Sequence, residues 1–528
     1  MATLIDITSN ILTENTVCFH EYELDSDKVN IPIEDGKFGI LNFKAVTSHE
    51  TNNELDLLFT VDCSGSMSDI CSDDRSKMQH IIHTLKNMVM FFNDHPNINV
   101  NITVCSFDNL IYETVPRIKV TEETISEIIS KIEKITPRNT TNIELALMNA
   151  AEKILEIKTL YPTNIISHIF MTDGETTDGS KNIDRLKSLV NSDIINSFIG
   201  FGIDHDACLL NEIASIGKSG YYFIDKLEYA GLVYGEILHG IIYKLLDNVE
   251  IQIENGLIYD FKIDEWVRNL QIGNIVSEAN KTFNIISDVP EKCRINIKGS
   301  LDNLILILPS TKVDDSDLTT HIYRQRTLQL LYKVNKFCIM KRETETFNRE
   351  HFQRRINDED NIYRILSRQK KELKLELSNL LEEIKKYIAD NNLNEDKILK
   401  NLCDDIYISY RTFGTRVGTM FCSARLTSQG AQRQYTAYDT HTLDCDEIEH
   451  QPIDHTAILP QHTTTGVIRN NLPRFPLFLR ETNIDNFPII QHEVSDFRDT
   501  PYFSNQVTQV MREISRSIDP RDDSSSLV

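Results

Sequence analysis

Residues 54–246 alternate short apolar runs with amphipathic segments. The first run, LDLLFTVD at residues 55–62, is apolar on both faces, which is typical of a strand buried inside a sheet. Further runs of the same kind follow along this part of the chain: NINVNITVCSF, LIYETVPRIKV, NIISHIFMTD, DIINSFIGFG and GYYFID. We interpret each of them as a strand.

The segments between these strands have helical spacing. After the first strand, apolar residues recur at intervals of three and four, namely Met78, Ile81, Ile82, Leu85, Met88, Val89 and Phe92. Other helix-like segments cover 122–134, 142–157, 181–190, 207–216 and the stretch that ends at Leu246. The resulting order, βαββααβαβαβα, predicts an α/β fold with a doubly wound, mostly parallel sheet.

The pattern changes after residue 246. Residues 247–312 alternate apolar and polar positions with a period of two, which predicts a small antiparallel, β-sandwich-like domain. Residues 29–53 also have strand character, and strands in that position would have unpaired edges, so we expect them to join the same domain. The sheet domain is then an insertion between two sets of strands.

Residues 313–426 are predicted to be helical. Leu366, Leu373, Leu377, Leu380, Ile384 and Ile388 lie close to a heptad stripe, which indicates coiled-coil-like packing. Residues 427–528 are polar and lack a sustained period, so we expect a largely flexible tail, with Pro501–Ser515 as a partner-binding segment. Residues 1–28 are likewise expected to be a flexible N-terminal segment.

Composition narrows the classes of partner. The chain has 528 residues, of which 40% are hydrophobic, and its 55 Lys and Arg against 79 Asp and Glu give a net charge of −24. Such a charge disfavours nucleic acid and anionic membranes as partners. No apolar run reaches the roughly 18 residues of a membrane span, and the first residues lack the features of a signal peptide.

The ten cysteines are scattered singly, which indicates reduced thiols and an intracellular, cytoplasmic location. Cys63 and Cys71 are the local pair in which a disulfide is worth testing. Heavy use of Ile and Asn is typical of AT-rich genomes, including those of protists and giant DNA viruses. For a viral protein the expected location is the host cytoplasm or the virion.

Candidate chemistry gathers where the predicted strands end. Asp62, Ser64 and Ser66 form a D-x-S-x-S motif directly after the first strand. Thr140 and Thr141 precede a predicted helix, and Asp173 follows a later strand. Ligands of open α/β sheets bind outside the carboxyl ends of the strands, so we expect these residues at one rim. Hydroxyl and carboxylate oxygens are hard ligands that suit Mg²⁺ or Mn²⁺.

Other polar residues at this rim have simpler interpretations. Asp69, Asp73 and Asp74 are interpreted as acids at a helix N-terminus rather than as a second metal site. His205, between Asp204 and Asp206, is interpreted as a loop residue that lines the pocket rather than as a metal ligand.

Over about residues 54–246 the sequence resembles the von Willebrand factor A family. The metal-ion-dependent adhesion site of that family uses D-x-S-x-S, a distant Thr and a distant Asp. The resemblance implies Ser64, Ser66 and Thr141 as hydroxyl ligands, with Asp62 and Asp173 as carboxylates that bind directly or through water. Thr141 is preferred to Thr140 because TNIELAL matches the helix start of the family. Arg138, Asn139 and Thr140 stand where the family usually has glycines.

The order of the parts is also similar to that of intracellular proteins related to ubiquitin ligases of the WAVY GROWTH type. Those proteins carry a RING finger ahead of the A domain, and the cysteines here lack its spacing. Ligase activity is therefore not expected.

The resemblance implies metal-dependent protein–protein recognition, in which the cation bridges to an acidic residue of a protein partner. An adaptor in a ubiquitin-ligase-like pathway and a Mg²⁺-dependent hydrolase are the alternatives. An enzyme is not expected, because Ser64 stands where aspartyl phosphatases have a second acid, and no phosphate-binding G-x-x-x-x-G-K-[ST] loop is present.

Overall fold

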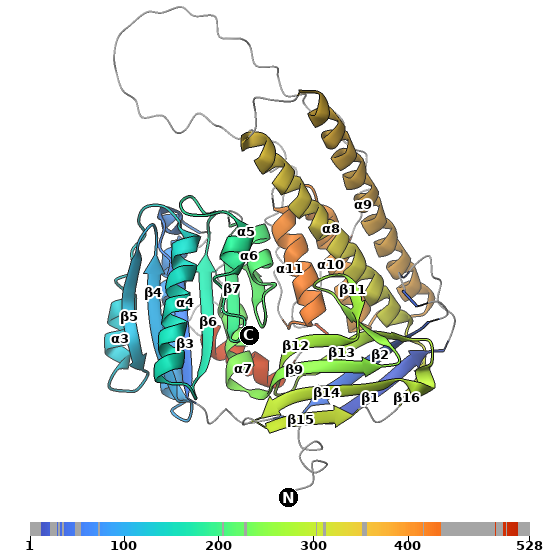
Figure 1. Cartoon of the computed structure of the whole chain (residues 1–528), viewed down its shortest axis with the longest axis horizontal. Helices are drawn as coiled ribbons and strands as arrows, with labels where there is room; N and C mark the ends of the chain where they lie inside the picture. The colour runs from blue at the N-terminus through green and yellow to red at the C-terminus, as the bar shows by residue number, and fades with distance from the viewer. Residues whose placement is uncertain are drawn as a thin grey trace, which may run out of the picture.

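The computed structural model describes most of the chain. It covers residues 12–21, 36–47, 54–71, 74–202, 205–225, 230–301, 304–309, 313–350, 356–415, 417–434, 500–502 and 504–515, with the single residues 29, 32, 33 and 492. Three parts lie together: an α/β domain, a pair of sheets and a group of long helices (Figure 1). None of the described helices combines the length and the apolarity needed to cross a bilayer.

The α/β domain contains a six-stranded sheet. Its strands, in spatial order, are β5 (Ile111–Lys119), β4 (Val100–Phe107), β3 (Leu55–Asp62), β6 (Ile165–Thr172), β7 (Ile195–Phe201) and β8 (Gly220–Ile224). All neighbours are parallel except β5, which is antiparallel to β4. The predicted mostly parallel sheet is therefore confirmed.

Helices cover both faces of this sheet, in the predicted order. They are α2 (Lys77–Asp94), α3 (Ile125–Ile132), α4 (Ile143–Leu160), α5 (Ile183–Lys187), α6 (Ala207–Ile213) and α7 (Ala230–Ile242). Leu57 and Phe59 of β3 share a buried cluster with α2, whereas Leu58 packs with Ile154 of α4. Every residue of β3 is buried because its alternate side chains pack against helices on opposite faces.

Two further sheets pack through a shared apolar core. One has the order β11 (Glu265–Val267), β10 (Leu257–Asp260), β13 (Asn280–Ser287), β2 (Lys37–Ala45), β1 (Leu12–His20) and β16 (Val313–Ser316). The other has the order β12 (Asn269–Val276), β9 (Lys244–Glu254), β14 (Arg294–Leu301) and β15 (Leu304–Pro309). Phe43 of β2 stacks on Phe283 of β13, and both contact this core.

The N-terminal strands therefore join the β domain, as expected from residues 29–53. The structure also contains a strand that the sequence analysis did not predict. Strand β1 lies within residues 1–28, which we expected to be flexible. Its apolar residues Val17 and Phe19 are buried in the shared core, and β2 and β16 pair with its two edges. Tertiary pairing thus orders a segment with weak local signals.

The helical part contains α8 (Thr319–Glu350), α9 (Ile356–Asp390), α10 (Lys397–Thr412) and α11 (Gly418–Ala431). The predicted stripe on α9 packs inside this group, where Leu377 and Ile384 contact apolar residues of α8 and α10. A coiled coil with another chain stays a prediction.

The expected flexible tail does not describe all of residues 427–528. Helix α11 continues to Ala431, and Asn505–Ser515 form helix α13, which packs against α7 and α2 of the α/β domain. Val510, Met511 and Ile514 of α13 are buried in the core of that domain. The segment that we expected to bind a partner therefore packs on the α/β domain of its own chain. Residues 435–491 lie outside the described residues.

Two glycines allow α13 to approach α7 closely. A Cβ atom at Gly235 would lie 2.5 Å from Met511 Cα, and one at Gly231 would lie 2.5 Å from Ser515 Oγ. A Cβ at Gly240, in the same helix, would meet no atom within 4 Å. The contact between the two helices therefore depends on the missing side chain at Gly235.

We predict that Gly235→Ala displaces α13, because the added methyl group would overlap the backbone of Met511. Hydrogen exchange of residues 505–515, measured by mass spectrometry, should become at least about tenfold faster. Gly240→Ala is the matched control. Its added methyl group would meet no atom within 4 Å, and alanine favours a helix by about 1 kcal/mol over glycine, so the exchange should not become faster. Equal protection in both variants would contradict the close packing.

Candidate metal centre

The loop after β3 folds back on the end of its own strand. Asp62 is the last residue of β3, and the backbone N–H of Ser64 donates to Asp62 Oδ1 over 2.8 Å. A short 3₁₀ helix, η1 (Gly65–Ser68), follows and turns Ser66 toward the same point. The hydroxyl oxygens of Ser64 and Ser66 lie 3.2 Å apart. Local geometry thus brings the first three predicted residues together.

The second carboxylate comes from the neighbouring strand. Asp173 follows β6, which pairs with β3 in parallel, and Ser66 Oγ donates to Asp173 Oδ1 over 2.8 Å. Thr172 Oγ1 donates to Asp62 Oδ2 over 2.5 Å. Sequence reasoning missed Thr172, although its place beside Asp173 at the end of a buried strand was a usable signal. Both carboxylates are fully buried.

Thr141 lies on the same side of the site. Its side chain is buried, whereas Thr140 is exposed. A Cβ atom at Gly174 would lie 3.5 Å from Thr141 Oγ1 and 3.7 Å from Ser66 Oγ, so the two hydroxyls converge on one space that a glycine leaves open. Among the described residues, Thr141 Oγ1 has no hydrogen-bond partner.

The loop before Thr141 adopts a backbone conformation that glycine usually provides. Asn139 has φ +37°, a left-handed conformation that asparagine tolerates better than most residues. Its carbonyl accepts from Gly65 N over 3.0 Å, and its Nδ2 donates to Asp108 Oδ2 over 3.1 Å. The departure from the glycine pattern is accommodated, and the Thr141 loop is joined to the D-x-S-x-S loop.

The two carboxylates of the site are stabilised differently: Asp62 by hydrogen bonds, and Asp173 by an ion pair with Lys77. Burial raises the pKa of Asp62 to about 6, and the nearby charge of Asp173 adds to this, while hydrogen bonds from Thr172 and Ser64 oppose it. Lys77, the first residue of α2, places Nζ 2.8 Å from Asp173 Oδ2 and 3.3 Å from Asp69 Oδ2. Sequence analysis did not identify Lys77 as part of the site.

The oxygen donors at this rim fit a hard divalent cation. Across the part of the chain that the structure describes, no group of three or more His, Cys, Asp or Glu side chains could hold a metal ion. A cation here would therefore depend on the hydroxyls of Ser64, Ser66 and Thr141 as well as on the two carboxylates. Hydroxyl and carboxylate oxygens are ligands of Mg²⁺ and Mn²⁺.

Two other residues of the rim, His205 and Asp206, have structural roles. His205 is buried, with Nδ1 2.8 Å from Gly202 O and Nε2 2.7 Å from Tyr221 Oη, and burial lowers its pKa to about 4. Asp206 caps α6 through Leu209 N. Cys63 and Cys71 are free thiols. Asp73 and Asp204 lie outside the described residues.

Comparison of the sequence with known protein families identifies a domain in this part of the chain. Residues 56–230 match the sequence profile of the von Willebrand factor type A domain. A search among curated proteins returns no significant match.

Solved structures with a similar arrangement include a von Willebrand factor type A protein from Catenulispora acidiphila, with 13% identity and a TM-score of 0.43 over 62% of this chain and 81% of that one. The ArnB paralog VWA2 from Sulfolobus acidocaldarius has 13% identity and a TM-score of 0.44, covering 79% of this chain and 97% of its own. Proximal thread matrix protein 1 from the mussel byssus, whose structure has a zinc-occupied MIDAS motif, has 20% identity and a TM-score of 0.28. The match covers 34% of this chain and 46% of that one.

Domains of this type generally mediate protein–protein interactions, and they commonly bind a divalent cation. The profile match, the sheet order and the loops at its rim give one conclusion: residues 56–230 of this chain form a von Willebrand factor type A domain.

Proposed function

We propose that the chain recognises a protein partner through a divalent cation at the rim of the A domain. The observation that carries this proposal is the convergence of Ser66 and Thr141 hydroxyls beside two buried carboxylates, with Thr141 Oγ1 left without a hydrogen bond among the described residues. A bound Mg²⁺ or Mn²⁺ would supply a coordination position that an acidic residue of the partner can fill.

Each residue of the centre has a separate task in this proposal. Ser64, Ser66 and Thr141 would bind the cation through hydroxyl oxygens. Thr172 and the backbone of Ser64 hold both oxygens of Asp62 in fixed positions, which keeps its carboxylate oriented toward the centre. Asp173 would contribute the second negative charge.

A binding function is favoured over hydrolysis. His205 is the histidine that the sequence placed at the same rim, and both of its ring nitrogens are already bonded within the protein. A general acid or base must reach the reacting group, which this histidine does not do. The similarity in layout to ubiquitin ligases of the WAVY GROWTH type, and an adaptor role in such a pathway, stay predictions.

We predict that Thr141→Ala weakens Mg²⁺ binding by at least about tenfold, because it removes one hydroxyl from the convergent set. Calorimetry with Mg²⁺ and with Mn²⁺ should show one site in the natural protein. Thr140→Ala is the matched control, since this neighbouring threonine is exposed, and it should bind as the natural protein does. Identical isotherms for the two variants would remove Thr141 from the site.

We predict that Lys77→Met strengthens divalent-cation binding by about tenfold, because the Lys77 ammonium occupies Asp173 Oδ2 and repels a second cation there. Lys86→Met is the control: it removes a lysine from the same helix that pairs with Glu133, away from the centre. The measurement is again calorimetry. Weaker binding in Lys77→Met would mean that Lys77 supports the site instead of competing with the cation.

Affinity purification tests the function itself. With Mg²⁺ present, the natural chain and Thr140→Ala should retain the same partner, and EDTA should release it. Thr141→Ala should fail to retain that partner. A partner that stays bound to Thr141→Ala in EDTA would contradict recognition through the cation.

A further inference from the structure

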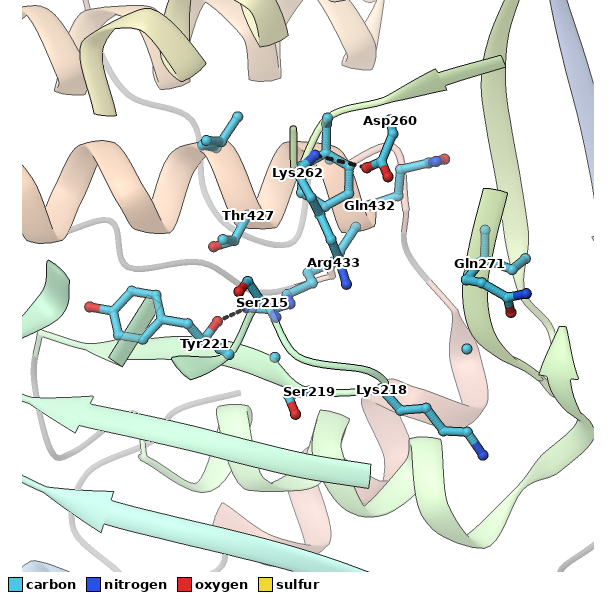
Figure 2. A pocket seen from close by; sticks show the side chains of 18 of the residues that line it. Ser215, Lys218, Ser219, Tyr221, Asp260, Lys262, Gln271, Thr427, Gln432 and Arg433 are labelled. Carbon is cyan, nitrogen blue, oxygen red and sulfur yellow. Dashed lines mark hydrogen bonds between the residues drawn. The ribbon is translucent and has the colours of Figure 1, made fainter. Parts of the chain in front are cut away.

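A cavity of about 360 Å³ lies where the three parts of the chain meet. Its walls come from β8 and α7 of the A domain, from β10, β12 and β13 of the sheets, and from α8 and α11 of the helical part. Figure 2 shows this pocket, in which Arg433, just after the end of α11, donates a hydrogen bond to the backbone carbonyl of Tyr221 in β8. Small-molecule sites often have this size, about 300–1,000 Å³, and often lie between domains.

Six cations line the cavity, and they come from all three of these regions. Lys218, ahead of β8, pairs with Asp247 Oδ1 over 2.8 Å, and Lys336 of α8 lies 5.5 Å from the centre of the Tyr332 ring. The other four come from the sheets and the helical part. Lys262 follows β10, Lys281 lies in β13, Arg324 lies in α8 and Arg433 follows α11. Figure 2 shows Lys262 and Arg433 extending into the pocket. Their gathering is unexpected in a chain whose net charge is −24.

Three of the four cations are anchored by neutral groups. Lys281 Nζ donates to the carbonyls of Ala431 and Gln432, over 2.7 and 3.0 Å. Arg324 donates to Thr282 O and to Gln429. The guanidinium of Arg433 donates to Tyr221 O and lies 3.7 Å from the centre of the Tyr222 ring.

Lys262 differs from these three. Its backbone N–H donates to Asp260 Oδ1, but its ammonium has no hydrogen bond or ion pair among the described residues. Partial burial lowers the pKa of the Lys262 ammonium, although part of the side chain stays exposed. The charge of Asp260 raises this pKa, and the charge of Arg433 lowers it further. Among these four cations, Lys262 is therefore the one whose ammonium has unused donors.

The cluster holds positive charge that the protein does not neutralise. None of the four cations pairs with a carboxylate within the described part of the chain, whereas Lys153, Lys158 and Lys187 elsewhere all do. Burial lowers the pKa of Lys281 to about 8; Glu236 opposes this, and Arg433 and Arg324 contribute to it. Over the whole lining, six cations face the three carboxylates of Glu212, Glu236 and Asp260, and the repulsion that comes with this excess of positive charge is relieved by an anion.

The rest of the lining is largely apolar. Phe261, Leu270, Ile272, Leu328 and Tyr332 contribute side chains to the same cavity. A ligand that only carried charge would leave these groups in contact with water, whereas a ligand with an apolar body would cover them. The two kinds of lining together define the chemistry of the occupant.

We propose that this pocket binds an amphipathic organic anion, in which an apolar, preferably aromatic body is joined to a phosphate, sulfonate or carboxylate group. The anionic group lies at Lys262 and Arg433, and the apolar body lies among the side chains named above. This site is separate from the cation centre and does not depend on it.

The test uses two dyes that differ in one sulfonate group. 8-Anilinonaphthalene-1-sulfonate carries the anion, and N-phenyl-1-naphthylamine is its neutral counterpart. Fluorescence titrations of the full chain in EDTA should show one saturable site for the sulfonate, with at least about tenfold tighter binding than for the neutral dye. Equal affinity for both dyes would overturn the proposal.

Variants assign the site to the pocket. Lys262→Met should weaken sulfonate binding about tenfold and leave the neutral dye unaffected, and Lys262→Arg should retain the affinity for the sulfonate. Lys292→Met is the control, because Lys292 is exposed in the same β domain and outside the pocket. Sulfonate binding that is the same in Lys262→Met and Lys292→Met would also overturn the proposal. Thermal melts of the four proteins verify that each variant is folded.

Discussion

The parallel pairing of β3 with β6 is the constraint on which the candidate centre depends. Val61 pairs with Met171 in this register, so Asp62 and Asp173 leave adjacent strands at nearly the same height. Because β3 is buried on both faces, its position in the sheet cannot shift without exposing its apolar residues to water. The two carboxylates are held close together by the packing of the whole domain, despite their repulsion.

Burial of two like charges requires compensation, and the structure provides it in two ways. Hydrogen bonds from Thr172 and Ser64 satisfy Asp62, and the ammonium of Lys77 neutralises Asp173. The pocket between the domains shows the opposite imbalance, since the cations that line it outnumber its carboxylates. An acidic chain thus carries one site suited to a cation and another suited to an anion.

The path of the chain joins its parts tightly. The A domain is inserted between β2 and β9, and the strands on both sides of the insertion meet in one core. Helix α13 then returns from the far end of the sequence, and Asn87 of α2 donates to the carbonyl of Ile514 over 2.9 Å. Near the end of α11, Gln432 bonds to Thr282 of β13. A ligand between these parts would therefore contact elements that are distant in sequence.

The local sequence pattern was sufficient to predict the elements of the α/β domain, because the period of apolar residues distinguishes buried strands from amphipathic helices. It also predicted where the site lies, because strand ends in such a fold meet at one rim. Together with the resemblance to the von Willebrand factor A family, it was also sufficient to propose Asp62, Ser64, Ser66, Thr141 and Asp173 as one set. Tertiary structure alone decided the rest. Strand β1 and helix α13 are short segments whose apolar faces acquire partners only when distant elements fold. Lys77 and Thr172 reach the centre through tertiary packing, which the spacing of residues along the chain does not reveal.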